Sequence, residues 1–321
     1  NKERTAGLPI ERFAAPKKAA IPLSMHLGAP CEPIVKKGES VRTGQKIADS
    51  DKAVSAPIHA SITGTVKAIE HFNHPLGPRV RSIIIEGDGT DTWIEGVEPS
   101  LFDKDAPCEV DFSKSAEFLS KIREAGIVGM GGATFPTHIK LSPPPDKKID
   151  TLILNGAECE PYLTADHVLM LERPRSILLG MRIMQEILKV QNVIISIENN
   201  KPDAVEAMRK AAEGYADVTI AVCQTRYPEG GEKQLINAVL GREVPSGKLP
   251  MEVGSVVQNV GTAFAVYEAV ALHKPLIERV LTVTGPAIRH PKNLLARIGT
   301  PFKDILNYCG YEDQENNKVI M

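Results

Sequence analysis

A glycine-rich stretch, residues 126–141, most constrains what this chain can fold into and bind. Its first seven residues include four glycines, Gly126, Gly129, Gly131 and Gly132. Such density lets the backbone adopt positive φ angles and bring its N–H groups against a ligand with no Cβ in the way. Successive N–H groups form a concave anion site, and the nearby Lys140 adds a point charge suited to phosphate. The stretch predicts an anion-binding loop, with a purely structural turn as the alternative.

This loop is not the usual dinucleotide-binding fingerprint. That motif, G-x-G-x-x-G, needs a further glycine where Thr134 stands, and it follows a strand and opens a helix. Here residues 113–125 precede the loop and read as a helix, because their apolar side chains fall on one face and Gly126 ends it. The strand 151–154 comes after the loop. The pattern therefore argues against a standard Rossmann nucleotide site that starts here.

Composition excludes several classes of function. The net charge of -2 gives no general attraction to nucleic acid. No uncharged run approaches the about 18 to 20 residues that a membrane helix needs, and no signal-peptide pattern opens the sequence. The five cysteines contain no C-x-x-C, so their spacing indicates no zinc or iron–sulfur site, and so sparse a set suits a reducing cytosol. Because the sequence stops inside an apolar stretch, we expect a fragment of a longer protein.

Changes in residue pattern divide the 321 residues into five segments. A polar lead-in arm (1–19) precedes short apolar runs separated by Gly, Pro and Asn, which predict an all-β domain (20–90). A linker (91–112) leads into an α/β unit (113–273). The last segment (274–321) has the order of a small β-grasp unit that is cut off as a new strand begins at 318–321.

The α/β unit alternates strands with helices. Strands are predicted at 151–154, 192–197 and 217–222, and helices near 165–172, 174–189 and 202–213. Such an alternation predicts a Rossmann-like parallel sheet with right-handed crossovers. Ligands of these sheets bind beyond the carboxyl ends of the strands. The glycine-rich stretch, the loop 155–161 and the loop 224–232 are therefore expected to converge on one mouth.

The all-β domain is similar to the lipoyl and biotinyl type of barrel-sandwich domain. Its Asp51-Lys52-Ala53 resembles the hairpin on which lipoyl domains carry their cofactor, although Lys52 follows Gly44-Gln45 about two residues sooner than in those domains. We therefore favour an exposed turn lysine over a lipoyl carrier. His26 and His59 flank apolar turns and are expected to be structural.

Four motifs, in chain order, resemble the FMN-binding flavoprotein subunit of respiratory complex I. They are Gly129–Lys140, Asn155–Pro161, Tyr227–Glu232 and Val257–Thr262. The barrel-sandwich stretch ahead of them, with Ser55-Ala-Pro-Ile-His-Ala-Ser-Ile-Thr-Gly, instead resembles the RnfC subunits of Rnf ion-translocating electron transport complexes. Together the two resemblances cover nearly all of the chain.

The resemblance implies a set of flavin-binding residues and one residue for NADH. The expected FMN contacts are Gly129, Gly131, Gly132 and Lys140 around the flavin and its phosphate, Asn155 and Glu158 at the ribityl chain and ring, Tyr227, Gly230, Gly231 and Glu232 on the next loop, and Gln258 with Asn259 as the paired amides. Glu160 is expected to contact NADH. The chain departs from the complex I pattern at Ala157 (an aspartate there), Gln258 (an asparagine) and Thr134 (a glycine).

The resemblance also implies the chemistry and the setting. NADH would pass a hydride to FMN, and the electrons would then leave singly through iron–sulfur centres, with no side-chain acid, base or nucleophile required. The family carries two [4Fe–4S] motifs beyond the β-grasp unit, outside these residues, so no metal site is expected within them. The expected partners are the other subunits of a membrane complex that exchanges electrons between NADH and ferredoxin, at the cytoplasmic face of the bacterial inner membrane.

Two other functions stay open from the sequence. A cobalamin reductase of the propanediol-utilisation type shares this order of domains. A docking scaffold with a degenerate flavin site is the non-enzymatic alternative, which Ala157 and Thr134 would permit. FMN binding separates the scaffold from the two enzymes.

Overall fold

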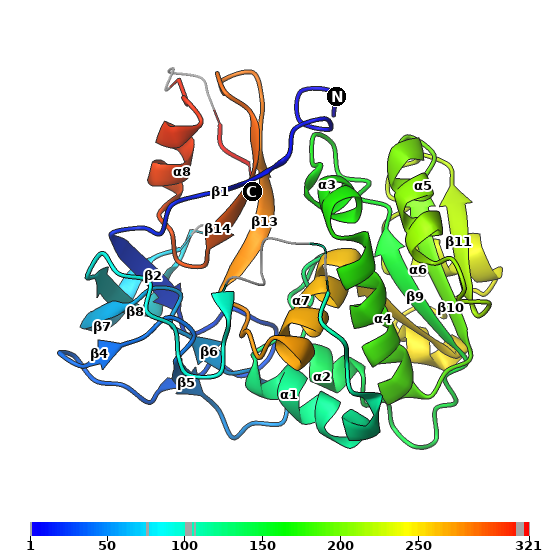
Figure 1. Cartoon of the computed structure of the whole chain (residues 1–321), viewed down its shortest axis with the longest axis horizontal. Coiled ribbons are helices and arrows are strands. Elements are labelled where there is room, and N and C mark those ends of the chain that lie inside the picture. Colours follow the sequence, from blue (N-terminus) through cyan, green and yellow to red (C-terminus); the bar gives the residue numbers. More distant parts are fainter. Residues whose placement is uncertain (1, 75–76, 100–104, 106, 313–317, 321) are drawn as a thin grey trace.

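The computed structural model describes residues 2–74, 77–99, 105, 107–312 and 318–320. These residues form three parts: a β-rich domain, an α/β domain, and a small C-terminal sheet with a helix beside it (Figure 1). In the view of Figure 1 the α/β domain lies to the right, with the β-rich domain and the C-terminal sheet stacked to its left.

The α/β domain is built on a four-stranded parallel sheet in the order β11-β10-β9-β12. The strands are β9 (Thr151–Gly156), β10 (Asn192–Glu198), β11 (Val218–Cys223) and β12 (Ser255–Asn259). Its helices are α3 (Ala165–Glu172), α4 (Pro174–Leu188), α5 (Pro202–Ala211), α6 (Glu232–Leu240) and α7 (Val260–Ala271), with a 3-10 helix η3 (Pro250–Val253) before β12. The predicted parallel sheet is confirmed.

Alternation along β9 explains why helices cover both faces of this sheet. Leu152 and Leu154 point into the main core, which contains apolar residues of α3, α4, α5 and α7. Ile153, between them, points the other way into a smaller cluster with Leu235 and Ile236 of α6. With both faces covered, the strands read as continuous apolar runs in the sequence.

The segment predicted as one helix before the glycine-rich stretch is a 3-10 helix followed by an α-helix. They are η2 (Phe112–Glu117) and α1 (Phe118–Glu124), with a break in helical geometry at Lys114. Gly126 then takes a left-handed φ of 68°, as expected of a residue that ends a helix. The short helix α2 (Thr137–Lys140) closes the glycine-rich stretch.

The β-rich domain consists of two facing sheets around their own core. One sheet has the order β2-β8-β7-β4 and the other β3-β5-β6. The strands are β2 (Lys18–Pro22), β3 (Glu32–Pro33), β4 (Ser40–Val41), β5 (Lys46–Asp49), β6 (Ile58–His59), β7 (Gly64–Asn73) and β8 (Arg79–Gly87). The predicted all-β domain is confirmed, and Lys52 is exposed in the loop between β5 and β6.

The C-terminal sheet contains a strand that the sequence did not predict. It has the order β1-β14-β13, with β13 (Glu278–Val283), β14 (Lys292–Arg297) and the helix α8 (Phe302–Tyr308) from the end of the chain. The third strand, β1 (Ile10–Arg12), comes from the lead-in arm and pairs in parallel with β14. The predicted start of a strand at 318–321 is wrong for residues 318–320, which have no regular structure, and Met321 lies outside the described residues.

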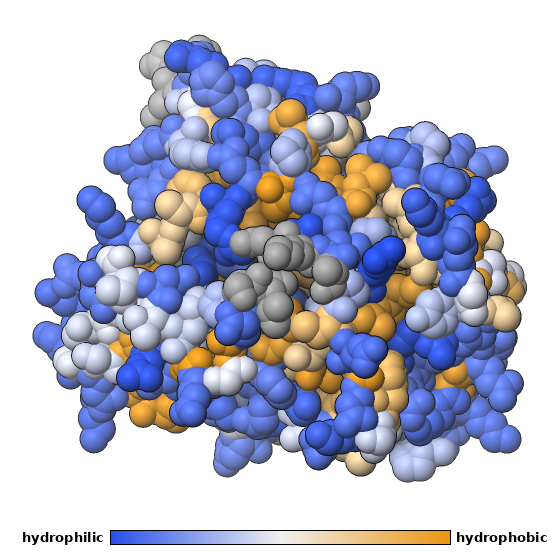
Figure 2. All heavy atoms as spheres, in the orientation of Figure 1, coloured by the Kyte–Doolittle hydropathy of each residue, from blue (hydrophilic) through white to orange (hydrophobic). Residues whose placement is uncertain are grey.

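The outer surface of this face is largely hydrophilic, as Figure 2 shows, with apolar side chains visible mainly toward the middle of the view. The limits predicted for the five segments stay a prediction. Part of the predicted linker, residues 100–104 and 106, lies outside the described residues.

Candidate functional site

The carboxyl ends of β9 and β12 lie side by side, because Asn155 pairs in register with Asn259. Asn259 is also the N-cap of α7, where its side-chain oxygen accepts from the N–H groups of Gly261 at 2.8 Å and Thr262 at 3.3 Å. This edge of a parallel sheet is where ligands bind. It therefore gives the reference point for the residues predicted from the sequence.

The glycine-rich stretch lies against this edge. A Cβ on Gly131 would come within 2.9 Å of the Asn259 Cβ, and the N–H of Met130 donates to Thr262 Oγ1 at 2.9 Å. Gly129, Gly131 and Gly132 do not have positive φ angles, so a left-handed backbone is not why these three are glycine. For Gly131 the reason is the close approach to Asn259.

Thr134 explains the departure from the family pattern at its position. Its φ is 50°, in the left-handed region that glycine enters without steric cost. The threonine therefore occupies the backbone conformation for which a glycine is the easier residue. The loop shape does not require that glycine.

The loop 155–161 is tied to the loop that ends in Gly231. The Asn155 amide donates to the carbonyl of Gly230 at 2.8 Å, and its oxygen accepts from the N–H of Ala157 at 3.1 Å. A Cβ on Gly230 would lie 2.8 Å from the Cys159 Sγ. The hydroxyl of Tyr227, whose residue is 64% exposed, donates to Glu160 at 3.4 Å.

Lys140 and Glu232 link the same two regions. Lys140 ends α2 after the glycine-rich stretch, Glu232 begins α6, and their charged groups are 2.5 Å apart. Gly231 is the N-cap of α6, where a Cβ would come within 2.6 Å of Gln234 Oε1. The three loops predicted to converge thus contact one another around the ends of β9 and β12.

Glu158 has a local role that sequence reasoning did not reveal. Its carboxylate accepts from the N–H groups of Asp166 at 2.7 Å and His167 at 3.3 Å, so it caps the N-terminus of α3. Burial, with the Asp166 carboxylate beside it, raises the pKa of Glu158 to about 7. Burial also raises the pKa of Asp166, whose carboxylate accepts from the Asn259 amide at 2.7 Å.

Gln258 has an unused hydrogen-bonding group next to this edge. It is 3% exposed, and its Nε2 has no hydrogen-bond partner among the described residues. A buried amide without a partner is costly, which suggests a group that a ligand supplies.

The residues present suit a flavin mononucleotide. Gln258 offers a buried unpaired donor, and Gly131 and Gly230 keep Cβ atoms out of a crowded junction. Lys140 offers a half-buried cation suited to a phosphate.

Two lysines of this region were missed from the sequence. Lys201 follows β10 and is 1% exposed; its ammonium donates to the carbonyl of Ala157 at 2.6 Å and pairs with Glu198 at 3.1 Å. The polar run after the apolar strand β10 was a signal that could have located it. Lys2 lies on the lead-in arm, and nothing in the sequence connects it to this loop.

The largest pocket described lies elsewhere. It has a volume of about 570 Å³, lies beside α4, and contains none of the predicted site residues. It is lined by Phe112, Leu179, Arg182, Gln185, Glu186, Lys189, Val190 and Tyr215. The Arg182 guanidinium lies over the Tyr215 ring at 5.2 Å and pairs with Asp217, which gives the pocket a structural explanation.

Among the described residues, no group of three or more His, Cys, Asp or Glu side chains could hold a metal ion. No helix in the same part of the chain has the length and apolar character to cross a membrane.

Comparisons with known proteins match these two domains. Residues 122–268 match the family model described as the Nuo51 FMN-binding domain, and residues 1–90 match the RnfC barrel sandwich hybrid domain. In solved structures, an NAD+-reducing [NiFe]-hydrogenase in the H2-reduced state shares the fold, with a TM-score of 0.58 at 23% identity over 66% of this chain and 42% of that one.

Two relatives align with essentially the whole chain. Both are the RnfC-type component of a ferredoxin:NAD(+) oxidoreductase complex, one that is proton-translocating and one that is Na(+)-translocating. The first, from Clostridium ljungdahlii, is 52% identical over 100% of this chain and 68% of its own length. The second, from Acetobacterium woodii, is 46% identical over 99% and 70%. The chain therefore belongs to the RnfC family of ion-translocating ferredoxin:NAD(+) oxidoreductase complexes.

Proposed function

We propose that this chain is the electron-input part of a membrane-bound Rnf-type complex, which couples electron transfer between NADH and ferredoxin to ion translocation. The observation that carries the proposal is the meeting of three loops at the ends of β9 and β12, inside the residues that match an FMN-binding domain. The identity of 52% with a component of a ferredoxin:NAD(+) oxidoreductase favours this function over a cobalamin reductase. We further propose that the chain sits at the cytoplasmic face of the inner membrane, held there by partner subunits.

In this proposal FMN is bound at the same edge of the sheet. Gly129, Gly131, Gly132 and Lys140 contact the flavin and its phosphate, and the other contacts come from Asn155, Glu158, Tyr227, Gly230, Gly231, Glu232, Gln258 and Asn259. The exposed carboxylate of Glu160 meets NADH. When bound, FMN accepts a hydride from NADH and passes electrons on one at a time, and iron–sulfur centres outside these residues receive them.

The chain's own residues supply position rather than acid–base chemistry. Asn155 fixes the loop 155–161 to Gly230, and Asn259 fixes α7 and Asp166 to the end of β12. Lys140 brings a positive charge to the glycine-rich stretch and shares it with Glu232. These contacts hold the three loops in one arrangement before a ligand arrives, which lowers the ordering cost of binding.

Titration of the purified chain with FMN, followed by anaerobic addition of NADH, tests this function. We expect the flavin absorbance to change on binding and to bleach with NADH. Gly131→Val should weaken FMN binding by about tenfold or more, because its side chain would collide with Asn259. Ala15→Val adds similar bulk at an exposed position and should leave binding unchanged.

Glu160→Gln separates the two ligands. It should raise the KM for NADH while leaving FMN affinity within about twofold, because Glu160 is exposed and its hydrogen bond with Tyr227 lies at the surface. A folded chain that binds no FMN would refute the flavoprotein function and leave the docking scaffold.

A further inference from the structure

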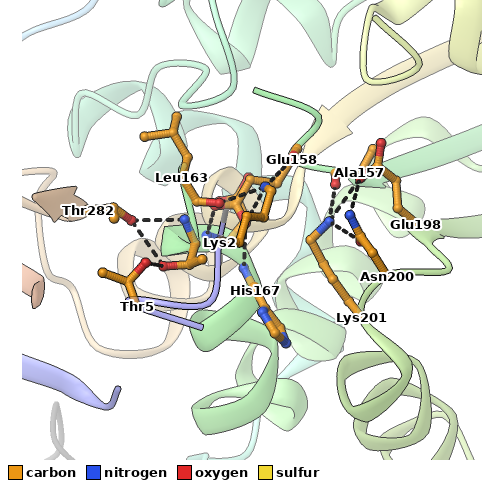
Figure 3. Close-up of polar contacts among 12 residues, drawn as sticks. Lys2, Thr5, Ala157, Glu158, Leu163, His167, Glu198, Asn200, Lys201 and Thr282 are labelled. Carbon is orange, nitrogen blue, oxygen red and sulfur yellow. Dashed lines mark hydrogen bonds and ion pairs between the residues drawn. The ribbon is translucent and has the colours of Figure 1, made fainter. Parts of the chain in front are cut away.

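Two lysine ammonium groups bind adjacent carbonyls of the loop 155–161. Lys201 Nζ donates to the carbonyl of Ala157 at 2.6 Å, and Lys2 Nζ donates to the carbonyl of Glu158 at 2.5 Å. Figure 3 shows the two lysines on either side of this loop, Lys2 to the left and Lys201 to the right. They come from distant parts of the chain, the lead-in arm and the N-terminus of α5.

Both ammonium groups have their hydrogen-bonding capacity used by named partners. Lys201 also donates to Glu198 at 3.1 Å and to Asn200 at 3.0 Å, which accounts for its three N–H groups. Lys2 also donates to the carbonyl of Leu163 at 2.6 Å. The Glu158 carboxylate lies 3.7 Å from Lys2 Nζ.

These contacts fix the direction of the peptide groups in the loop. Hydrogen bonds from an ammonium to a carbonyl are among the stronger ones, and those of Lys201 are shielded from water. Because each peptide group is planar, holding the carbonyls of Ala157 and Glu158 also fixes the N–H groups of Glu158 and Cys159. The next residue, Glu160, is the one expected to meet NADH.

The arm that carries Lys2 is anchored independently of this loop. Asn293 of β14 donates to the carbonyls of Thr5 at 2.9 Å and Leu8 at 3.0 Å. The Arg4 guanidinium donates to the carbonyls of Gly285 at 2.5 Å and Ile288 at 2.9 Å. Lys2 is therefore held by the C-terminal sheet, and it has little freedom to leave the loop.

We propose that Lys2 and Lys201 are positioning residues of the flavin site, which clamp the loop 155–161 in the conformation that binds FMN and NADH. The inference rests on the proposed function, and it adds to the site two residues that lie outside the four motifs. It also makes the lead-in arm part of the site.

The thiol of Cys159 reports on the loop without any flavin. Cys159 lies between the two glutamates, and its Sγ packs at Gly230. In the chain without FMN, Lys2→Met should raise the alkylation rate of Cys159 by iodoacetamide on the order of tenfold, since the loop loses two charge-assisted hydrogen bonds. Peptide mass spectrometry separates Cys159 from Cys108, whose rate should not change; the other three cysteines are buried.

The second readout is ligand binding. Lys2→Met should raise the Kd for FMN and the KM for NADH about tenfold, and Lys2→Arg should recover part of both. The matched control is Lys37→Met, the same substitution at an exposed lysine of the β-rich domain. Lys201→Met should act in the same direction; because it leaves Glu198 buried without its partner, its folding is checked first by thermal unfolding.

The outcomes separate this inference from the function on which it rests. Unchanged Cys159 alkylation in Lys2→Met would overturn the clamp, whatever the chain binds. Faster alkylation with unchanged FMN affinity and unchanged KM for NADH would overturn the positioning role. If the unmodified chain binds no FMN, the proposed function fails, and the alkylation rates still decide whether Lys2 holds the loop.

Discussion

At Glu158 the backbone is left-handed, with φ of 48°, and the carboxylate turns inward to cap α3. The sequence predicted this glutamate as a flavin contact, from its place in a motif. Its cap on α3 depends on the helix lying eight residues further on, in a position that spacing alone does not give. The structure therefore adds a stabilising role to the proposed binding role.

The raised pKa of Glu158 predicts how stability depends on pH. The folded value is about 7 and the ordinary value 4.5, so the folded chain holds a proton that the unfolded chain has lost between these two pH values. The free energy of unfolding should therefore fall as pH rises from about 4.5 to about 7. The charged groups facing Glu158 are Asp166 of α3, Lys2 of the arm and Lys201 of α5.

Glu158→Gln should remove this component, by up to about 1.4 kcal/mol per pH unit. Urea unfolding at pH 5, 6, 7 and 8 measures it, with Glu206→Gln on the exposed face of α5 as the control. The same pH slope in Glu158→Gln and in the parent chain would contradict the buried, protonatable state.

Among single residues, the sequence located the site better than it explained it. Gly131 was predicted for its backbone freedom, but its φ is not positive and the reason is contact with Asn259. Lys2 was not predicted at all, because the loop that it binds lies 156 residues away. Contacts over such separations leave no periodic or local signal in one sequence.

Among the elements, α4 and α7 pack closely at Gly180. The apolar residues of both helices lie in the main core. An ideal Cβ on Gly180 would lie 1.7 Å from the carbonyl oxygen of Ala263, so the two helix backbones meet where only glycine fits.

Gly180→Ala should destabilise the chain, although alanine is favoured over glycine inside a helix by about 1 kcal/mol. The collision forces the two helices apart, which costs on the order of 1–3 kcal/mol or more. Chemical unfolding measures the loss, with Gly7→Ala, which has no atom within 4 Å of its Cβ, as the control. An unchanged or higher stability of Gly180→Ala would show that α4 and α7 can separate freely.

The elements with long periodic patterns were predicted well. The strands of the parallel sheet and the helices α3 and α4 lie within one or two residues of their predicted limits. The three-residue strand β1 was missed because it is too short for a pattern and its partner, β14, is about 280 residues away. The predicted strand at 318–321 rested on an apolar run alone, which does not guarantee a pairing partner.

At the scale of the whole molecule, a buried ionic network joins the C-terminal sheet to the other parts. Glu278 of β13 lies 2.7 Å from Lys274, 3.2 Å from Arg297 of β14 and 3.3 Å from Arg12 of β1. Arg297 reaches the β-rich domain side through Asp91 at 2.8 Å and lies over the Trp93 ring. Burial opposes the charge of Glu278, but the cations Lys274 and Arg297 lower its pKa to about 2.

Glu278→Gln should destabilise the whole chain by about 3–5 kcal/mol, because it leaves buried cations without their carboxylate. Thermal unfolding measures it, with Glu86→Gln as the control, since the exposed pair of Glu86 and Lys67 is worth at most about 1 kcal/mol. Since the folded pKa is below 4.5, this stabilisation should be present above pH 4.5 and be lost as pH falls toward 2. Equal effects of the two variants would mean that the network contributes no more than a surface pair.

The most direct test of the account is the position of bound FMN, determined by crystallography or electron cryomicroscopy of the chain with the flavin. We predict density beyond the carboxyl ends of β9 and β12, against Gly131, Asn155 and Asn259, with Lys2 and Lys201 still on the loop 155–161. Flavin bound elsewhere, for example in the pocket beside α4, would contradict the proposed site.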